Sequence, residues 1–367
     1  MKKLYLGLLI IFILSATPAL AASKSTASAK ATWKPLAPDG YTPITWAKAP
    51  GIASFFKTPD GGGAIDFVTR IYLPQNQINF IISTGTPIDS SPIATTSDQA
   101  VSSTDTSSTT TVTDINNFPN LSFQRLGAEL AKTVAPSIKF LWDAQFFNMQ
   151  PTFTDLSLAV KYTVGTSTTI SRGTRSIPDM NEARRMLLIN NQTGTATIGD
   201  FDSAVFVDSK IGDQALEGFN PAVAKADSAS GAASRLFLGV SDDGKELIVY
   251  CSQLATVAEA SAELANAGAS PEHQLEADGG GSAACGYNLP GQFFVEPTRT
   301  LPLLMGAETI LKRGTVAGKT MNVRSGPATK NPIVAQLSKG AIVKVFEEKS
   351  GWYRIGIGQW VLKSLIK

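Results

Sequence analysis

The chain has 367 residues, of which 43% are hydrophobic and 17% are charged, and its formal net charge is +2. This composition excludes a mainly disordered chain, and the length exceeds that of a typical single domain. His273 is the sole histidine, which excludes a zinc site built from several histidines and allows a Ser-His-Asp triad at one position only. The sequence predicts no cofactor, no metal and no nucleic-acid partner.

The first 21 residues have the pattern of a secretory signal peptide. Lys2 and Lys3 precede an almost unbroken apolar run over residues 6–14, and Ala19-Leu20-Ala21 forms a cleavage site of the A-x-A type. The apolar run is too short to span a bilayer unaided, and an uncleaved anchor is the alternative interpretation. We therefore expect a secreted or cell-envelope protein with no transmembrane segment after cleavage.

Composition defines the next segments. Residues 22–50 are expected to form a flexible lead-in, since Ser23 to Thr32 is rich in Ser, Ala and Lys. Residues 51–308 are expected to form the first domain, which has a strand of alternating apolar residues over 64–73. Within it, residues 84–114 are mostly Ser, Thr and Asp with few large apolar side chains, which predicts a disordered low-complexity insertion.

Later in this domain, helical and strand patterns alternate, which indicates an α+β fold. Turn chemistry and a terminal glycine delimit several of these elements. The predicted elements are helices over 123–134 and 256–268, a buried strand over 138–142, and two hairpins, which pair 185–189 with 196–198 and 236–240 with 246–250.

Cys251 and Cys285 are the only cysteines. In an oxidising compartment they are expected to pair, and two buried free thiols are the alternative.

Residues 314–367 predict a small all-β barrel, because short strand-forming runs alternate closely with turns. From Thr315 onward, nine basic residues stand against two acidic ones, a net charge of +7. This excess of positive charge favours binding to an anionic wall or membrane polymer. The alternative is an ordinary lysine-rich surface that only contacts solvent. The predicted strands are 320–324, 333–337, 341–346, 352–355 and 359–362.

Motifs in this segment resemble the bacterial SH3-like domain family: Met-Asn-Val-Arg-Ser-Gly-Pro over 321–327, Gly-Trp-Tyr-Arg over 351–354 and Gln-Trp-Val over 359–361. The resemblance implies a module that binds peptidoglycan or another wall component, usually beside an enzyme. Tyr353 and Arg324 are the candidates for wall contact. Trp352 and Trp360 are expected to fill the barrel rather than to bind a ligand.

Three glycines in the segment Asp278-Gly-Gly-Gly-Ser282 follow a predicted strand. Such a turn has an open backbone whose N–H groups can face an anion, and a simple loop is the alternative. Arg235 before a Gly-Val strand, an Asp-Gly hairpin, a helix ending in glycine and then this turn together resemble the phosphodiester glycosidase family, a mixed-sheet fold. The segment Asp143-Ala-Gln-Phe-Phe147 resembles that family's Asn-Gly-Gly-Phe-Phe segment less closely.

The resemblance implies hydrolysis of sugar-1-phosphodiesters in a sugar-phosphate glycoconjugate or wall glycopolymer. Arg235 and the N–H groups of Gly279, Gly280 and Gly281 would bind the phosphate, and Ser282 would position the substrate.

The reaction also needs a carboxylate pair, for which Asp278 is the first candidate and Glu276 and Asp143 are the next. Glu276 and Asp278 are two residues apart on a predicted strand and are expected to share one face. Asp143 and Glu276 stand where the family often has Asn, and Ala144 and Gln145 replace two glycines. A non-catalytic wall-binding protein that retains the hydrolase fold is therefore the alternative. A structural ion pair at Arg235 and Asp278, or a turn role for Asp143, would fit that alternative.

Overall fold

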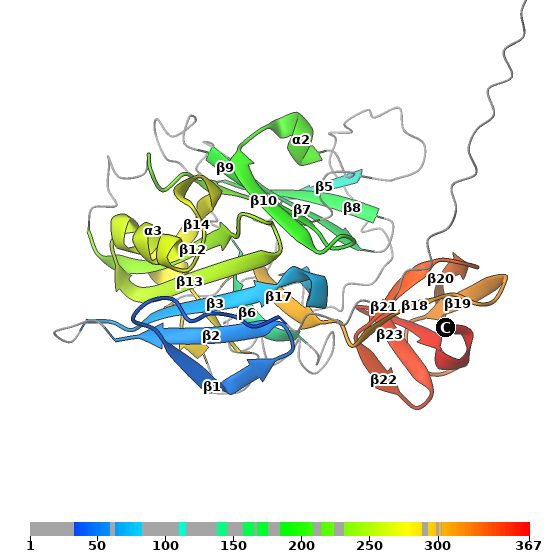
Figure 1. Ribbon diagram of the computed structural model, residues 1–367. Coiled ribbons are helices and arrows are strands. Elements are labelled where there is room, and N and C mark those ends of the chain that lie inside the picture. Colours follow the sequence, from blue (N-terminus) through cyan, green and yellow to red (C-terminus); the bar gives the residue numbers. More distant parts are fainter. Residues whose placement is uncertain are drawn as a thin grey trace, which may run out of the picture. The chain divides into compact units, whose positions relative to one another are not determined.

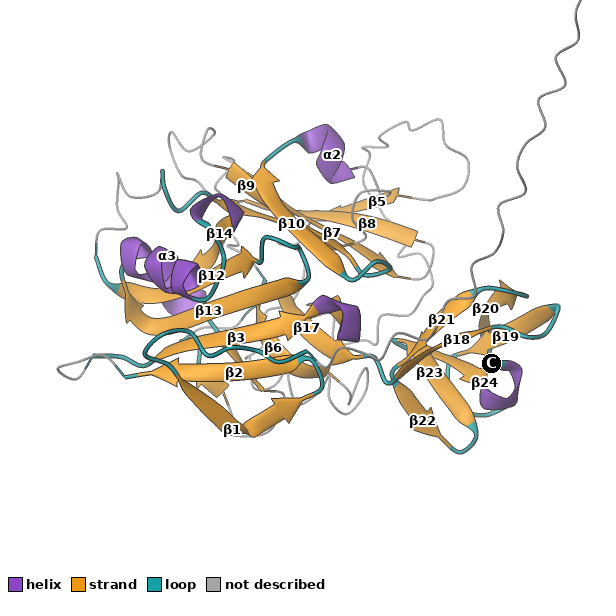
Figure 2. Ribbon diagram, in the orientation of Figure 1, coloured by secondary structure: helices purple, strands orange, loops and turns teal. Residues whose placement is uncertain are grey.

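The structure is a computed structural model, and it describes residues 33–58, 63–82, 110–114, 138–144, 157–164, 167–174, 184–207, 214–223, 231–287, 293–298, 301 and 303–367. The signal peptide, the helix expected over 123–134 and residues 145–147 lie outside these ranges. The described part is mostly β (Figures 1 and 2), so the α+β fold is confirmed only in part. Within these ranges, no helix has both the length and the apolar character needed to cross a bilayer.

A large central sheet contains the hairpins predicted from turn chemistry. Its strands are antiparallel to their neighbours except for β5 and β8, which are parallel, so the sheet is mixed. In spatial order the strands are β1 (Thr42–Ala49), β2 (Ile52–Lys57), β3 (Asp66–Tyr72), β13 (Glu246–Ala255), β12 (Ala233–Val240), β14 (Gln274–Gly279), β11 (Gln214–Phe219), β7 (Ser157–Val164), β8 (Ser167–Thr174) and β5 (Thr110–Asp114), with β9 (Arg184–Asn190) beside β11 and β10 (Thr195–Asp200) beside β9.

Two strands of this sheet lie in segments that were predicted to be irregular. Residues 42–49 of the expected lead-in form β1, which pairs with β2, and Ile44 is buried in the core. Residues 110–114, at the end of the expected disordered insertion, form β5. Composition misses β5 because Thr-Thr-Val-Thr-Asp has few large apolar residues, yet β-branched residues suit a strand that pairs through its backbone.

A second sheet packs on one face of the central sheet. Leu236 and Leu238 of β12 join Phe140 and Trp142 of β6 in one core cluster, and all four are fully buried. The strands of this second sheet are, in order, β16 (Phe293–Val295), β15 (Cys285–Tyr287), β6 (Ile138–Asp143), β17 (Leu303–Thr309) and β4 (Asn76–Ile82).

A disulfide between Cys251 of β13 and Cys285 of β15 joins the two sheets inside this core. It closes a loop with a sequence separation of 34 residues. Replacing both cysteines with serine should lower the free energy of unfolding by about 2–4 kcal/mol, because the unlinked unfolded chain has more conformational freedom. Urea unfolding of the parent and the double variant, each with and without reductant, measures this difference. A parent whose stability does not change on complete reduction would contradict the prediction.

The helix predicted over 256–268 is confirmed as α3 (Val257–Asn266), which covers the other face of the central sheet. Thr256 and Glu259 form a capping box at its start, and Gly268 follows its end at φ +98°. Gly239 of β12 lets this segment approach, since a Cβ there would lie 2.5 Å from the Ala269 Cβ. A short helix, α2 (Ser203–Val207), follows β10.

The C-terminal segment forms the predicted barrel of short strands around Val323, Val345, Tyr353 and Val361. Its first strand begins at Lys312, two residues before the expected boundary. The strands are β18 (Lys312–Thr315), which pairs with β21 (Ile342–Val345), and β20 (Ile333–Ser338), β19 (Thr320–Arg324), β24 (Gln359–Leu362), β23 (Trp352–Gly356) and β22 (Glu347–Lys349), which form a sheet in that order.

Candidate functional site

Arg235 is the best-anchored of the predicted site residues. Its guanidinium donates from Nη1 to Glu276 Oε1 (3.1 Å), from Nη2 to the Gly231 carbonyl (3.2 Å) and from Nε to the Ala255 carbonyl (3.2 Å). The side chains of Arg235 and Glu276 are 10% and 5% exposed. These contacts hold the planar guanidinium in one orientation, which is a requirement for directional recognition of a phosphate.

The glycine turn lies directly against Arg235. Gly279 pairs with Arg235 across β12 and β14, and a Cβ on Gly279 would lie 3.4 Å from Arg235 Nη1. Gly280 has φ +62°, a left-handed conformation that favours glycine, and it starts the 3₁₀ turn η5 (Gly280–Ser282). Ser282 is buried at the end of this turn. The structure therefore brings together Arg235, Glu276 and the start of the glycine turn.

A polar row continues from Arg235 across the central sheet. Arg235 pairs with Ser252, Ser252 pairs with Asp66, and Asp66 pairs with Lys57, so these side chains share one face of the sheet. It is the face that α3 covers, because Tyr250, two residues before Ser252, packs with α3. Ser252 is fully buried, whereas Asp66 and Lys57 are half-exposed. Lys57, Asp66 and Ser252 were not among the predicted site residues, because no motif includes them.

Asp66 is the half-exposed carboxyl group of this row. Its Oδ1 accepts a hydrogen bond from the Tyr250 hydroxyl (2.7 Å). Burial raises the pKa of Asp66, the hydrogen bonds from Tyr250 and Ser252 oppose that rise, and nearby Glu263 adds to it while Lys57 lowers it. Lys57 Nζ also lies 2.5 Å from Glu263 Oε1, on α3. The net effect is a carboxyl group that takes up a proton more readily than an ordinary aspartate.

The expectation that Glu276 and Asp278 share one face is wrong. Glu276 pairs with Phe237 on β12, and Asp278 pairs with the neighbouring residue, Leu236. Two steps along β14 therefore correspond to one step along β12, so Ala277 is an extra residue in β14. Phe237 faces α3 and Leu236 faces the second sheet. This β-bulge therefore places Glu276 on the α3 face and Asp278 on the inter-sheet face.

Asp278 contacts the start of the glycine turn in this arrangement. Its Oδ1 accepts a hydrogen bond from the Gly279 N–H (2.5 Å), and the residue is 1% exposed. A buried carboxylate that accepts a backbone N–H from the next residue fixes the backbone at the start of the turn.

Asp143 lies at the end of β6 and is also 1% exposed. Its Oδ1 accepts the Ala144 N–H (2.8 Å), and its own N–H donates to the Ala284 carbonyl (2.9 Å), just after the glycine turn. Alternation along β6 places Asp143 on the face opposite Trp142, whose ring packs in the inter-sheet core. The three predicted carboxylates therefore lie on three different sheet faces. Glu276 is on the α3 face of the central sheet, Asp278 is on its inter-sheet face, and Asp143 is on the outer face of the second sheet.

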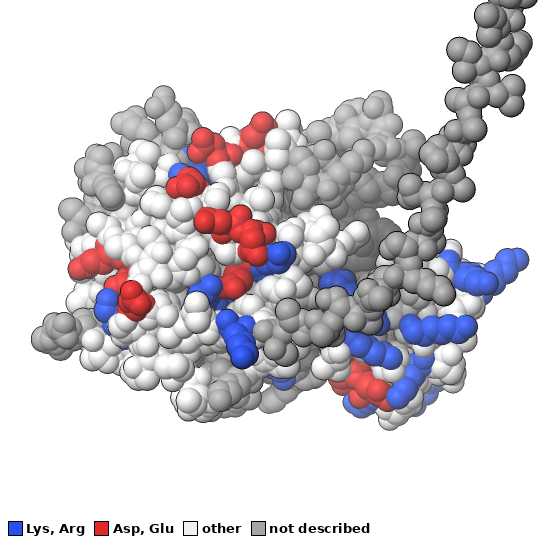
Figure 3. Space-filling model, viewed as in Figure 1, with Lys and Arg blue, Asp and Glu red and all other residues white. Residues whose placement is uncertain are grey.

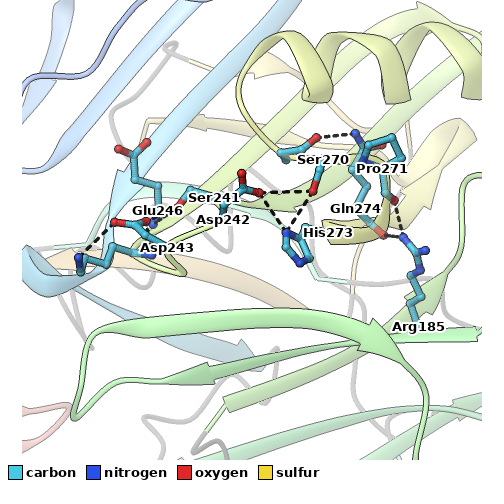
Figure 4. Close-up of polar contacts among 11 residues, drawn as sticks. Arg185, Ser241, Asp242, Asp243, Glu246, Ser270, Pro271, His273 and Gln274 are labelled. Carbon is cyan, nitrogen blue, oxygen red and sulfur yellow. Dashed lines mark hydrogen bonds and ion pairs between the residues drawn. The ribbon is translucent and has the colours of Figure 1, made fainter.

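His273 does not form a catalytic triad with its neighbours (Figure 4). Ser270 Oγ lies 3.2 Å and Asp242 Oδ1 lies 3.4 Å from the same ring nitrogen, Nδ1. A triad requires the serine and the carboxylate at opposite ring nitrogens. Nearby, Arg185 donates to two carbonyls of the same turn (2.7 and 2.8 Å), so these contacts organise the turn before β14.

Tyr353 of the barrel was expected at the surface for wall contact, but it is only 4% exposed. Its ring packs in the barrel core opposite Val361, and Lys312 Nζ and Lys363 Nζ lie 4.2 and 5.5 Å from the ring centroid. Both faces of β23 are covered at this point, since Trp352, Tyr353 and Arg354 are all buried, so Tyr353 is not at the surface. Trp352 and Trp360, each 8% exposed, are buried.

Basic residues outnumber acidic residues in the barrel. Both acidic residues of the barrel have cationic partners, since Glu347 contacts Arg354 (3.1 Å) and Glu348 contacts Lys363. Figure 3 shows Lys and Arg side chains spread over the visible face of the barrel. Arg324, the other predicted wall-contact residue, is half-buried and donates to the Asn331 carbonyl (2.7 Å). The barrel therefore carries a positive charge that its own acidic residues do not neutralise.

Among the residues that the structure describes, no group of three or more His, Cys, Asp or Glu is placed to hold a metal ion.

Residues 319–367 match the bacterial SH3 domain family, which confirms the predicted C-terminal module and is consistent with binding to wall components. No curated protein matches the chain in sequence. Among solved structures, the catalytic domain of zebrafish N-acetylglucosamine-1-phosphodiester alpha-N-acetylglucosaminidase is similar with a TM-score of 0.44 and 11% identity, over 71% of this chain and 85% of that chain. A hypothetical protein from Synechocystis is similar with a TM-score of 0.39 and 12% identity, over 73% of this chain and 64% of that chain. Neither similarity bears on activity.

Proposed function

We propose that the chain is an exported hydrolase that cleaves the bond between a sugar and a phosphate in sugar-1-phosphodiesters of envelope glycopolymers. In this proposal the C-terminal SH3 module holds the enzyme at peptidoglycan or an associated wall polymer. The observation that supports it most is the contact between Arg235 and the glycine turn, which puts a fixed guanidinium beside backbone N–H groups.

The phosphate group of the substrate would bind Arg235 and the N–H groups of Gly280 and Gly281, since the Gly279 N–H already donates to Asp278. The bond from the anomeric carbon to the bridging oxygen breaks, and the phosphomonoester leaves with the electron pair. The oxygen of a water molecule bonds to the anomeric carbon, and a carboxylate takes the proton of that water.

Each carboxylate then has a distinct role in the proposal. Asp66 takes the proton, because it is half-exposed, lies on the face of Arg235 and has a raised pKa. Glu276 orients Arg235, and Asp278 holds the glycine turn. Asp143 supports the backbone on the far side of the turn through Ala284. Ser282 would position the substrate from the end of the turn.

Hydrolysis of UDP-N-acetylglucosamine by the purified full chain tests the proposal. In water labelled with heavy oxygen, release of free N-acetylglucosamine together with unlabelled UDP would support it, since the bond to the anomeric carbon is then the one broken. Absence of release, both from this compound and from isolated wall polymers, would contradict it.

Replacing Asp66 with asparagine should abolish the acidic limb of the pH–activity profile and reduce kcat by about 100-fold or more. The same change should alter stability. Because the folded state raises the pKa of Asp66, its stabilising contribution is present below the unfolded pKa, about 4, and is lost as pH rises through the folded value. The variant avoids this loss, so at neutral pH it should be at least as stable as the parent.

Thermal unfolding at pH 3.5 and pH 7 measures the effect on stability. Asp243→Asn, a change of an exposed aspartate on the β12–β13 hairpin, is the control for activity. An acidic limb that survives in the Asp66 variant would refute the assigned role.

The alternative function is a non-catalytic wall-binding protein. One observation favours it: the Glu276 carboxylate contacts Arg235 at 3.1 Å, in a position where the resemblance expects Asn, and a carboxylate competes with phosphate for the guanidinium. In that case the full chain would sediment with isolated wall polymers but would release no sugar.

A further inference from the structure

Trp46 is a large aromatic side chain exposed on an edge strand. It lies in β1, the outermost strand of the central sheet, and is 54% exposed. Between Pro43 and Lys48 the pairing of β1 with β2 is irregular, so Trp46 lies in a bulged part of the strand. Bulges at sheet edges redirect side chains, and they are frequent beside binding sites.

Two buried aromatic rings support the Trp46 ring from below. Its centroid lies 6.1 Å from Tyr287 at an interplanar angle of 63°, and 5.9 Å from Phe294 at 71°. Phe294 in turn stacks on Phe67 at 4.7 Å. Edge contacts of this kind fix the ring while more than half of the side chain remains in contact with solvent. A large, rigid ring loses little conformational entropy when a ligand binds to it.

The aromatic support is connected to the glycine turn on both sides. Tyr287 ends β15, which begins at Cys285, three residues after Ser282. Phe294 is in β16, which pairs with β15, and just beyond β16 the Thr298 N–H donates to the Gly281 carbonyl (2.9 Å). The strands under Trp46 therefore begin and end at the turn proposed to bind phosphate.

We propose that Trp46 is a stacking platform for a pyranose ring of the glycan, in a sugar subsite that is separate from Arg235 and is joined to the glycine turn through β15 and β16. The C–H bonds on one face of a pyranose carry partial positive charge and pack against the electron-rich face of an indole ring, while its hydroxyl groups remain in water. A sugar ring fits a single exposed tryptophan better than a protein partner does, since Trp46 is a lone exposed ring on its edge strand and protein interfaces need a much larger apolar surface. The link to catalysis rests on the proposed function, but the binding of sugar does not.

The test is binding of a β-1,4-linked N-acetylglucosamine tetramer to the full chain, measured by isothermal titration calorimetry, together with the kinetics of UDP-N-acetylglucosamine hydrolysis. The variants are Trp46→Leu, which keeps an apolar side chain but removes the ring, and Trp46→Phe, which keeps an aromatic ring. Leu254→Ala is the matched control, because Leu254 is also 54% exposed on the same sheet. Thermal unfolding of each variant checks that the fold is retained.

Trp46→Leu should weaken binding of the tetramer at least about tenfold, Trp46→Phe by only a few-fold, and Leu254→Ala not at all. Tetramer binding that depends on Trp46 without any hydrolysis by the parent would support the sugar subsite and refute the proposed hydrolase. Hydrolysis by the parent together with unchanged tetramer affinity in Trp46→Leu would overturn the subsite alone. Failure of the parent to bind the tetramer at millimolar concentration would also overturn the subsite. It would be overturned as well if Trp46→Leu changed only the oligomeric state of the protein.

Discussion

The free energy of unfolding of the full chain should fall by about 3–5 kcal/mol when Arg354 is replaced by methionine. Arg354, on β23 of the barrel, is 2% exposed, and its Nη2 contacts Glu308 of β17, which is 1% exposed. Glu308 also accepts a hydrogen bond from Asn79 of β4 (3.0 Å). Methionine fills a similar volume but removes the cation, so the cost is that of a buried carboxylate that has lost its counter-charge.

Two further variants separate this cost from a general effect of losing an arginine. Arg313→Met, at an exposed position on β18, should change stability by less than about 0.5 kcal/mol. Adding Glu308→Gln to Arg354→Met should restore roughly half of the lost stability, because glutamine can still accept from Asn79 and carries no charge. Urea unfolding measures all three, and equal stability of the Arg354 and Arg313 variants would contradict the assignment of a buried ion pair.

Arg235→Lys should reduce kcat/KM for UDP-N-acetylglucosamine by about 100- to 1000-fold. Lysine keeps the positive charge, but it has a single nitrogen, which cannot reproduce the contacts of the guanidinium with Glu276, Gly231 and Ala255 and bind a phosphate at the same time. Charge alone is therefore not sufficient, and the loss should appear in kcat as well as in KM.

The matched control is Arg70→Lys. Arg70 is also on the central sheet and donates to a glutamate, Glu246, at 2.6 Å. Its replacement should leave kcat/KM within about twofold of the parent, since it lies outside the polar row. Equal activity of the two lysine variants, with both folded by circular dichroism, would show that Arg235 does not bind substrate.

Local signals predicted the elements that depend on nearby residues. The β12–β13 hairpin follows from its Asp-Gly turn, α3 from its alanine-rich amphipathic pattern and terminal glycine, and the barrel strands from their short alternating runs. The order of motifs predicted that Arg235 and Gly279 lie close together, and in the structure they face each other on paired strands.

Features that depend on register could not be predicted in this way. Lys57 and Asp66 join the row of Arg235 only because β2, β3, β13 and β12 pair in one register, and nothing within either residue's own segment specifies that register. The burial of Tyr353 depends likewise on what covers each face of β23. The bulge at Ala277 has no residue signature, because the extra residue is not a glycine.

That single extra residue in β14 determines how a change of chain length would act on the site. Loss of one codon at position 277 would restore regular alternation with Glu276 still opposite Phe237 and Asp278 still opposite Leu236, so both carboxylates would keep their faces. Relatives of this chain can therefore be one residue shorter before the glycine turn and keep the same acidic side chain beside Arg235. In comparing such sequences, a one-residue gap at this point does not by itself indicate a changed site.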